Sequence, residues 1–154
     1  MMDLNLSARK ATIDDLQAII NLLIDDDLGS KRESVSDKLD SRYIKAFELI
    51  DIDRNQYLMV IEKAKEIVAT CHLTIMPSLT LKGSTRMQIE AVRVYEKLRG
   101  HKIGELMMSH ALKFAKSNNV SLIQLTTNIQ RPRAKLFYER LGFEASHVGM
   151  KLYI

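Results

Sequence analysis

The chain has 154 residues, of which 46% are hydrophobic and 27% charged, and its formal net charge at pH 7 is +4. These values lie near globular averages, so they exclude a disordered chain or a fibrous repeat and predict one folded domain over residues 1–154. No apolar run approaches the ~20 residues that cross a bilayer, no apolar leader is present, and Cys71 is the single cysteine, so we expect a cytoplasmic protein without membrane contact.

The charge is unevenly distributed along the chain. Residues 1–60 hold 8 Lys and Arg against 12 Asp and Glu, whereas residues 61–154 hold 15 against 7. A basic second part favours an anionic ligand. Because it has no zinc-ligand spacing and no arginine-rich tail, we expect a small phosphorylated ligand and no nucleic acid.

The N-terminal segment predicts a strand followed by an amphipathic helix. Residues 4–10 alternate weakly between apolar and polar. Thr12 and Asp15 have the spacing of a helix N-cap and its capping-box acid, and the apolar stripe that follows extends to Leu23. We therefore expect the first helix to begin near residue 12.

A polar segment and a hairpin come next. Residues 25–55 are polar and acidic, with a second helix expected around residues 36–49. Residues 57–62 and 67–76 are apolar, are rich in β-branched side chains and are separated by a polar turn. They predict two antiparallel strands.

The second half of the chain alternates strands and helices. Residues 87–95 predict a central strand that is apolar on both faces, and residues 103–115 follow the strongest helical period in the chain. Residues 120–127 predict a strand and residues 132–141 a short helix with proline at its start and glycine after its end. Residues 143–154 are expected to close the fold as one or two strands.

The loop between the central strand and the strongest helix has the features of an anion site. It contains Gly100 and Gly104, which allow close approach to the backbone, and Lys97, Arg99 and Lys102, which add positive charge. The first turn of a helix presents unpaired N–H groups and the positive end of its dipole to a phosphate. An ordinary tight turn into a core helix is the alternative, whereas the P-loop and dinucleotide fingerprints are absent.

Two motifs at a fixed separation carry a family resemblance. The first is Ile89-Glu90-Ala91-Val92-Arg93-Val94, followed after four residues by Arg99-Gly100-His101-Lys102-Ile103-Gly104. The second is Leu125-Thr126-Thr127-Asn128 with Ala134-Lys135-Leu136-Phe137-Tyr138-Glu139-Arg140-Leu141-Gly142-Phe143. Together they resemble the GNAT superfamily of N-acetyltransferases, closely over residues 87–143 and by element order elsewhere.

The resemblance implies a fold and a cosubstrate. The fold is the GNAT-like mixed α/β arrangement, a mostly antiparallel central sheet of six to seven strands, flanked by about four helices and splayed between the fourth and fifth strands. The cosubstrate is acetyl-CoA, and no metal is expected. The residues implied to bind it are Val92, Arg93, Val94, Arg99, Gly100, His101, Lys102, Ile103, Gly104, Asn128, Arg131 and Tyr138, with the pyrophosphate on the loop and the pantetheine along the strand.

Two positions depart from the family pattern. Lys102 stands where the family has its first glycine, so its backbone must avoid positive φ or accept strain of about 1–2 kcal/mol. Arg131 stands where many members have Asn. With Asn128 just upstream, this variant resembles the aminoalkylphosphonate acetyltransferase-like branch of the superfamily.

Acetyl transfer to an amine requires proton transfers. An amine with a pKa near ~10.4 is protonated at pH 7, so a base must remove its proton before attack on the thioester. The resemblance implies that Tyr138 is the general acid at the sulfur and that Glu90 is the base, directly or through water. The alternatives are that Tyr138 only packs in the core and that Glu90 is a solvated strand residue.

Other reactive side chains fit structural roles better. His110 lies on the apolar stripe of its helix and is expected to be a core histidine. His72, His101 and His147 are too far apart in the sequence to suggest a metal site. Cys71 lies mid-strand and is expected to act as a small buried hydrophobe, so we expect direct transfer without an acyl-enzyme.

The expected partner is a small-molecule or peptide amine, and a homodimer is an open alternative. The resemblance implies that residues 25–55 form one wall of the acceptor site, whose acidic balance would favour cationic amines. Lys31, Arg32 or Arg93 would instead favour an anionic acceptor. A catalytically idle acetyl-CoA-binding sensor is the alternative function.

Overall fold

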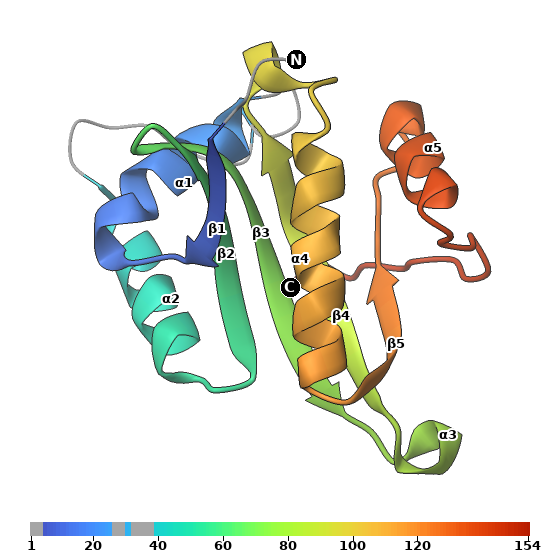
Figure 1. Cartoon of the computed structure of the whole chain (residues 1–154). Coiled ribbons are helices and arrows are strands. Elements are labelled where there is room, and N and C mark those ends of the chain that lie inside the picture. The colour runs from blue at the N-terminus through green and yellow to red at the C-terminus, as the bar shows by residue number, and fades with distance from the viewer. Residues whose placement is uncertain (1–4, 26–29, 32–38) are drawn as a thin grey trace. The chain divides into compact units, whose positions relative to one another are not determined.

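A computed structural model of the chain describes residues 5–25, 30–31 and 39–154 (Figure 1). The chain divides into two compact units, Met1–Gln124 and Leu125–Ile154. The first unit contains every described helix except the last and nearly all of the sheet. The single domain that the sequence predicts over residues 1–154 stays a prediction.

The predicted capping residues join the first strand to the first helix. Strand β1 (Leu6–Lys10) leads through a 3₁₀ turn (Ile13–Asp15) into α1 (Leu16–Ile24). The Asp15 carboxylate accepts the Thr12 N–H at 2.8 Å, which confirms the capping-box prediction. The Arg9 guanidinium donates to both Asp15 oxygens, at 2.6 and 2.9 Å, so the cap is also an ion pair.

This cap predicts an acid-dependent stability. Hydrogen bonds from Arg9 hold the pKa of Asp15 below its usual range, although burial opposes them. A carboxyl of this kind stabilises the fold fully above its unfolded pKa of about 3.9, and the contribution is lost as the pH falls through the folded value. Asp15→Asn should therefore lower the free energy of unfolding by about 2 kcal/mol at pH 7 and by less below pH 4. Urea unfolding tests this, with the exposed Asp14→Asn as control. Equal losses in the two variants would contradict it.

The second helix begins later than predicted. Helix α2 spans Ser41–Ile52, because Asp40 accepts the Arg42 N–H at 2.8 Å and caps it. The expected start at residue 36 lies outside the described residues. Residues 39 and 40 are not helical, and the expected helix is confirmed over residues 41–49.

The hairpin and the central strand form at the predicted positions, although the apolar residues of the central strand gather on one face. Strands β2 (Gln56–Lys63) and β3 (Glu66–Pro77) pair antiparallel across a two-residue turn, and β4 (Thr85–Val94) pairs antiparallel with β3. β5 (Val120–Leu125) follows α4 (Ile103–Ser117). The strand order in the sheet is β1-β2-β3-β4-β5, and β4 and β5 run in the same direction, so the sheet is mixed (Figure 1).

Residue alternation divides the sheet of the first unit into two buried faces. Leu58 and Val60 on β2 pack with Phe47 of α2 and with the apolar stripe of α1, and we call this side the α1/α2 face. Cys71 on β3 points to the opposite side, where α4 packs against β3 and β4 and buries Met107 completely. We call this side the α4 face.

The prediction of one or two strands over residues 143–154 is wrong, and this error explains why fewer strands are found than were expected. Residues 144–154 form no strand, and Met150, Leu152 and Tyr153 are 87 to 92% exposed. Their apolar alternation is typical of a strand, but a strand is stable only when a neighbour completes its hydrogen bonds. The described residues therefore hold five strands, where six to seven were expected.

The helix count also differs from the prediction. The described residues hold five α-helices, where about four were expected, because a short turn, α3 (Thr80–Gly83), lies between β3 and β4. Helix α5 (Pro132–Arg140) confirms the last predicted helix, with Pro132 at its start. The splay between the fourth and fifth strands stays a prediction.

Candidate functional site

The segment from β4 to α4 contains most of the expected site residues, all within the first unit. After β4 the chain makes a 3₁₀ turn (Glu96–Leu98) and then two left-handed residues, Gly100 with φ +82° and Lys102 with φ +62°, before α4 begins. The N–H groups of Ile103 and Gly104 lie in the first turn of α4, where a helix offers them no carbonyl partner. The loop is therefore shaped to bind an anion through its backbone.

Lys102 adopts a positive φ, which is the strained one of the two alternatives that the sequence left open. Because an L-residue pays roughly 1–2 kcal/mol in this region, Lys102→Gly should relieve strain, while the freer unfolded chain offsets about 0.4–1 kcal/mol of the gain. We expect the free energy of unfolding to rise by about 0.5 kcal/mol, measured from the urea midpoint. Gly100→Ala is the matched control, because it places a side chain at φ +82° and should destabilise the protein. Destabilisation by Lys102→Gly would show that the lysine side chain stabilises the turn.

Arg99 ties this loop to the end of α1. Its Nε donates to the Val94 carbonyl oxygen at 3.2 Å, and its Nη2 donates to the Asp25 carbonyl oxygen at 3.0 Å. The Asp25 carboxylate in turn accepts the Glu96 N–H at 2.9 Å. The Arg99 side chain is 45% exposed, so solvent still reaches it. Its expected contact with a pyrophosphate stays a prediction.

A β-bulge lies in the middle of the expected pantetheine strand. On β3, Thr70 and His72 are two residues apart, yet they pair with Arg93 and Glu90, which are three apart. The extra residue is accommodated at Ala91, which has φ +50°. The bulge reverses the alternation of β4 and bends the strand, a feature that is common next to active sites.

The bulge separates the expected catalytic carboxylate from the expected pantetheine contacts. Glu90 is exposed, and its register places it on the α1/α2 face opposite His72. Val92 and Val94 are partly buried, and Val94 pairs with Ala69, a residue of the α4 face. The roles proposed for these residues stay predictions.

The other candidate side chains agree with structural roles. Burial raises the pKa of Cys71 to about 12, so this thiol is protonated at neutral pH and is no nucleophile. His110 is partly buried on α4. Among the described residues, no group of three His, Cys, Asp or Glu side chains is arranged to hold a metal ion.

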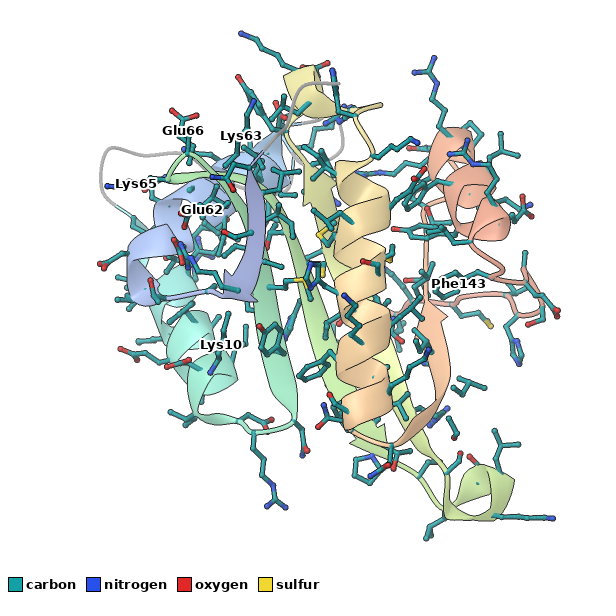
Figure 2. All side chains as sticks on the ribbon, in the orientation of Figure 1. Lys10, Glu62, Lys63, Lys65, Glu66 and Phe143 are labelled. Atoms are coloured by element: carbon teal, nitrogen blue, oxygen red, sulfur yellow. The ribbon has the colours of Figure 1, made fainter. Side chains whose placement is uncertain are left out.

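A separate cavity of about 420 Å³ lies at the β2–β3 turn. Its lining includes Asp14, Asp15, Glu66, Lys65 and Tyr95, and Figure 2 shows Lys65 and Glu66 at this turn. Three carboxylates against one ammonium disfavour a phosphate. The expected anion site at the loop before α4 stays a prediction.

The remaining expected residues lie in the second unit. Asn128 stabilises the turn before α5. Its Oδ1 accepts the Gln130 N–H at 2.9 Å, and its carbonyl oxygen accepts the Arg131 N–H at 2.9 Å. The Tyr138 ring lies edge-on to Phe143, with ring centroids 5.8 Å apart. Figure 2 shows Phe143 just after α5. The unit thus brings Asn128, Arg131 and Tyr138 onto one loop and helix, and their position relative to β4 stays a prediction.

The mixed sheet, the bulged central strand and the left-handed turn into α4 define an α/β protein with a left-handed loop at the N-terminus of a helix. The profile of the Acetyltransferase (GNAT) family matches residues 16–143, and the chain belongs to that family. In the described ranges, no helix has the length and apolar content needed to cross a bilayer.

Known proteins resemble the chain to different extents. An aminoalkylphosphonate N-acetyltransferase of Salmonella typhimurium is 37% identical over 60 residues, which are 39% of this chain and 39% of that protein. The crystal structure of a transcriptional regulator from Bacillus halodurans C-125 is 43% identical, with a TM-score of 0.94 over 97% of this chain and 99% of that one. The structure of a predicted acetyltransferase with acetyl-CoA from Clostridium acetobutylicum shares the fold, with a TM-score of 0.76, 19% identity and 96% of each chain covered.

Proposed function

We propose that the protein is an acetyl-CoA-dependent N-acetyltransferase that moves the acetyl group directly to a primary amine of a small-molecule or peptide acceptor. Membership of the acetyltransferase family supports acyl transfer. The observation that carries the proposal is the β4–α4 segment, in which a bulged strand ends in a left-handed turn at a helix N-terminus. This turn aims backbone N–H groups and the positive end of a helix dipole at one point.

The residues of this segment fit the diphosphate of acetyl-CoA. Gly100 and Lys102 have left-handed backbone conformations that turn the chain into α4. The space beside Gly100 is open, because a Cβ added there would meet no atom within 4 Å. The loop between β4 and α4 also carries three cationic side chains, those of Lys97, Arg99 and Lys102. The N–H groups at the start of α4 would hold phosphate oxygens, and the lysine and arginine side chains would neutralise their charge.

The proposed chemistry uses three kinds of groups from the chain. Acetyl-CoA supplies an acetyl group activated as a thioester. Glu90 removes the proton of the acceptor ammonium, directly or through water. A backbone N–H between Val92 and Val94 stabilises negative charge that develops on a carbonyl oxygen, and the Tyr138 hydroxyl holds the proton that a departing thiolate needs.

The acceptor is proposed to be a small amine. The name of the Salmonella relative supports an aminoalkylphosphonate, whose anionic group would need a cationic partner such as Arg93 on the α1/α2 face. Asp25, on the same unit, would instead favour a second ammonium. Most of the acidic segment that the sequence assigns to the acceptor wall, residues 26–29 and 32–38, lies outside the described residues.

A thiol-release assay tests the function. Acetyl-CoA is mixed with the protein and with a panel of aminoalkylphosphonates, aminoglycosides, polyamines, peptides and simple amines, and free thiol is measured along with the mass of the acceptor. We expect one class to gain a single acetyl group with one thiol released per acceptor. Thiol release without acetylated amine would contradict the proposal.

The second candidate is a regulatory protein that binds acetyl-CoA without turnover. It is favoured by the close structural relative from Bacillus halodurans, which is described as a transcriptional regulator. In that case acetyl-CoA should raise the melting temperature, since a ligand at 100 times its Kd stabilises the fold by about 2.7 kcal/mol, while no amine is acetylated. The thiol assay and the thermal shift together separate the two functions.

A further inference from the structure

A histidine faces the expected catalytic carboxylate across the sheet. His72 on β3 pairs with Glu90 on β4 and, on its other side, with Leu58 on β2. Residues directly opposite in an antiparallel pair point to the same face, with their Cβ atoms about 4.5–5.5 Å apart. Because Leu58 belongs to the core cluster under α1 and α2, both His72 and Glu90 lie on the α1/α2 face.

The imidazole has a buried nitrogen without a partner. The Nε2 atom of His72 is shielded from solvent, and no hydrogen-bond partner for it is present among the described residues. Leaving such an atom unsatisfied costs about 1–3 kcal/mol, so native proteins rarely leave one without a water, an ion or a functional partner. A water molecule or a substrate group that reaches this nitrogen would satisfy it.

The surroundings determine the charge of this histidine. Burial lowers the pKa of His72, and the charge of Glu90 acts in the opposite direction. The facing helix α1 contributes no titratable group, and Leu58 contributes none from β2. On α2, Tyr43 packs against the same core cluster. Arg86, opposite Met76, and Arg93, opposite Thr70, share this face of β4 with Glu90. The imidazole is therefore neutral at pH 7 and able to accept a proton.

We propose that His72 and Glu90 act together as the proton acceptor of the transfer site. The Glu90 carboxylate takes a proton from the acceptor ammonium, and the His72 imidazole takes that proton from the carboxylate. The inference rests on the proposed function. The ammonium loses one proton to the carboxylate, the proton passes to the imidazole directly or through one water, and it leaves to solvent. The nitrogen keeps the electron pair of the broken N–H bond.

The pair is better matched to neutral pH than a lone carboxylate. The reference pKa of a free imidazole, near ~6.5, is higher than that of a free carboxyl, near ~4.3, so an imidazole is the stronger base of the two. The charge of Glu90 opposes the lowering that burial causes in the pKa of His72. A negative charge across the strand stabilises the imidazolium that forms. The bulge at Ala91 sets this geometry, because it ends the regular ladder directly after Glu90.

The test is the pH dependence of kcat/KM for an acceptor identified in the thiol assay. His72→Asn should lower kcat/KM at pH 7 about 10- to 100-fold and move the acid limb of the profile toward the range of a lone carboxylate. Glu90→Gln should also lower the rate, and the double variant should lose less than the product of the two single losses. His110→Asn, on the helix across the sheet, is the matched control and should leave the profile unchanged.

A measurement on Glu90→Gln keeps the test independent of how well His72→Asn folds. In that variant the NMR titration of the His72 ring should move to lower pH, because the facing negative charge is gone. An unmoved His72 titration, an unchanged acid limb in a folded His72→Asn protein, or single losses that multiply fully in the double variant would overturn the inference. Absence of amine turnover in the wild type would instead reject the proposed function.

Discussion

Tyr138→Phe is expected to lower kcat about 10²- to 10⁴-fold while the fold and the affinity for acetyl-CoA survive, because the change deletes one hydroxyl and almost no volume. The ring itself should keep its place, since its edge-on contacts with Phe137 and Phe143, at centroid distances of 5.2 and 5.8 Å, do not need the hydroxyl. Steady-state kinetics and the melting temperature measure both effects.

The loss should depend on the thiol that leaves. A thiolate of low pKa departs without a proton, so an acetyl thioester of an aromatic thiol should restore much of the activity of Tyr138→Phe. Tyr153→Phe is the control, because Tyr153 belongs to the same unit and is 87% exposed. Equal kcat values for the wild type and Tyr138→Phe would assign Tyr138 to core packing alone.

Local signals were enough to predict most of the elements. The β2–β3 hairpin, α4 and α5 each have their own apolar period and turn residues within about 20 residues, and each is found where the sequence placed it. The bulge in β4 also left a signal. The apolar positions shift from the odd-numbered Met87 and Ile89 to the even-numbered Val92 and Val94, which predicts apolar residues on both faces of the strand. In the structure the extra residue at Ala91 offsets this shift, so Met87, Ile89 and Val94 all pair with residues of the α4 face.

Features that depend on distant pairing could not be predicted. Arg99 and Asp25 are 74 residues apart, and nothing near either residue indicates their contact. The sequence indicates no catalytic role for His72, because its place opposite Glu90 follows from the register of β3 and β4 and not from its sequence neighbours. Counting residues from the β2–β3 turn would have paired Leu58 with Cys71, because a register shift between Ile61 and Glu62 moves the pairing by one residue, and the bulge at Ala91 hides the alignment with β4.

In residues 143–154 a local pattern predicts a strand that does not form. Val148, Met150 and Leu152 have the spacing of a strand, and a sequence window cannot show whether a hydrogen-bonding neighbour is present. A local pattern therefore predicts the faces of a strand, whereas the strand itself forms through its partner.

Gly104→Glu is expected to weaken acetyl-CoA binding about 10³-fold. Gly104 lies in the first turn of α4, where the N–H groups and the helix dipole favour an anion. A carboxylate there would repel a phosphate by about 4 kcal/mol at 4 Å near a protein surface, and each 1.4 kcal/mol is a tenfold change in Kd.

Calorimetry measures the affinity, and Ser117→Glu, with the same added charge at the exposed far end of α4, is the control. Lys102→Glu, a change of exposed charge in the same loop, should weaken binding in the same direction, so that a folding defect in Gly104→Glu would not decide the result. Unchanged affinity in folded Gly104→Glu and Lys102→Glu would show that the diphosphate binds away from the start of α4.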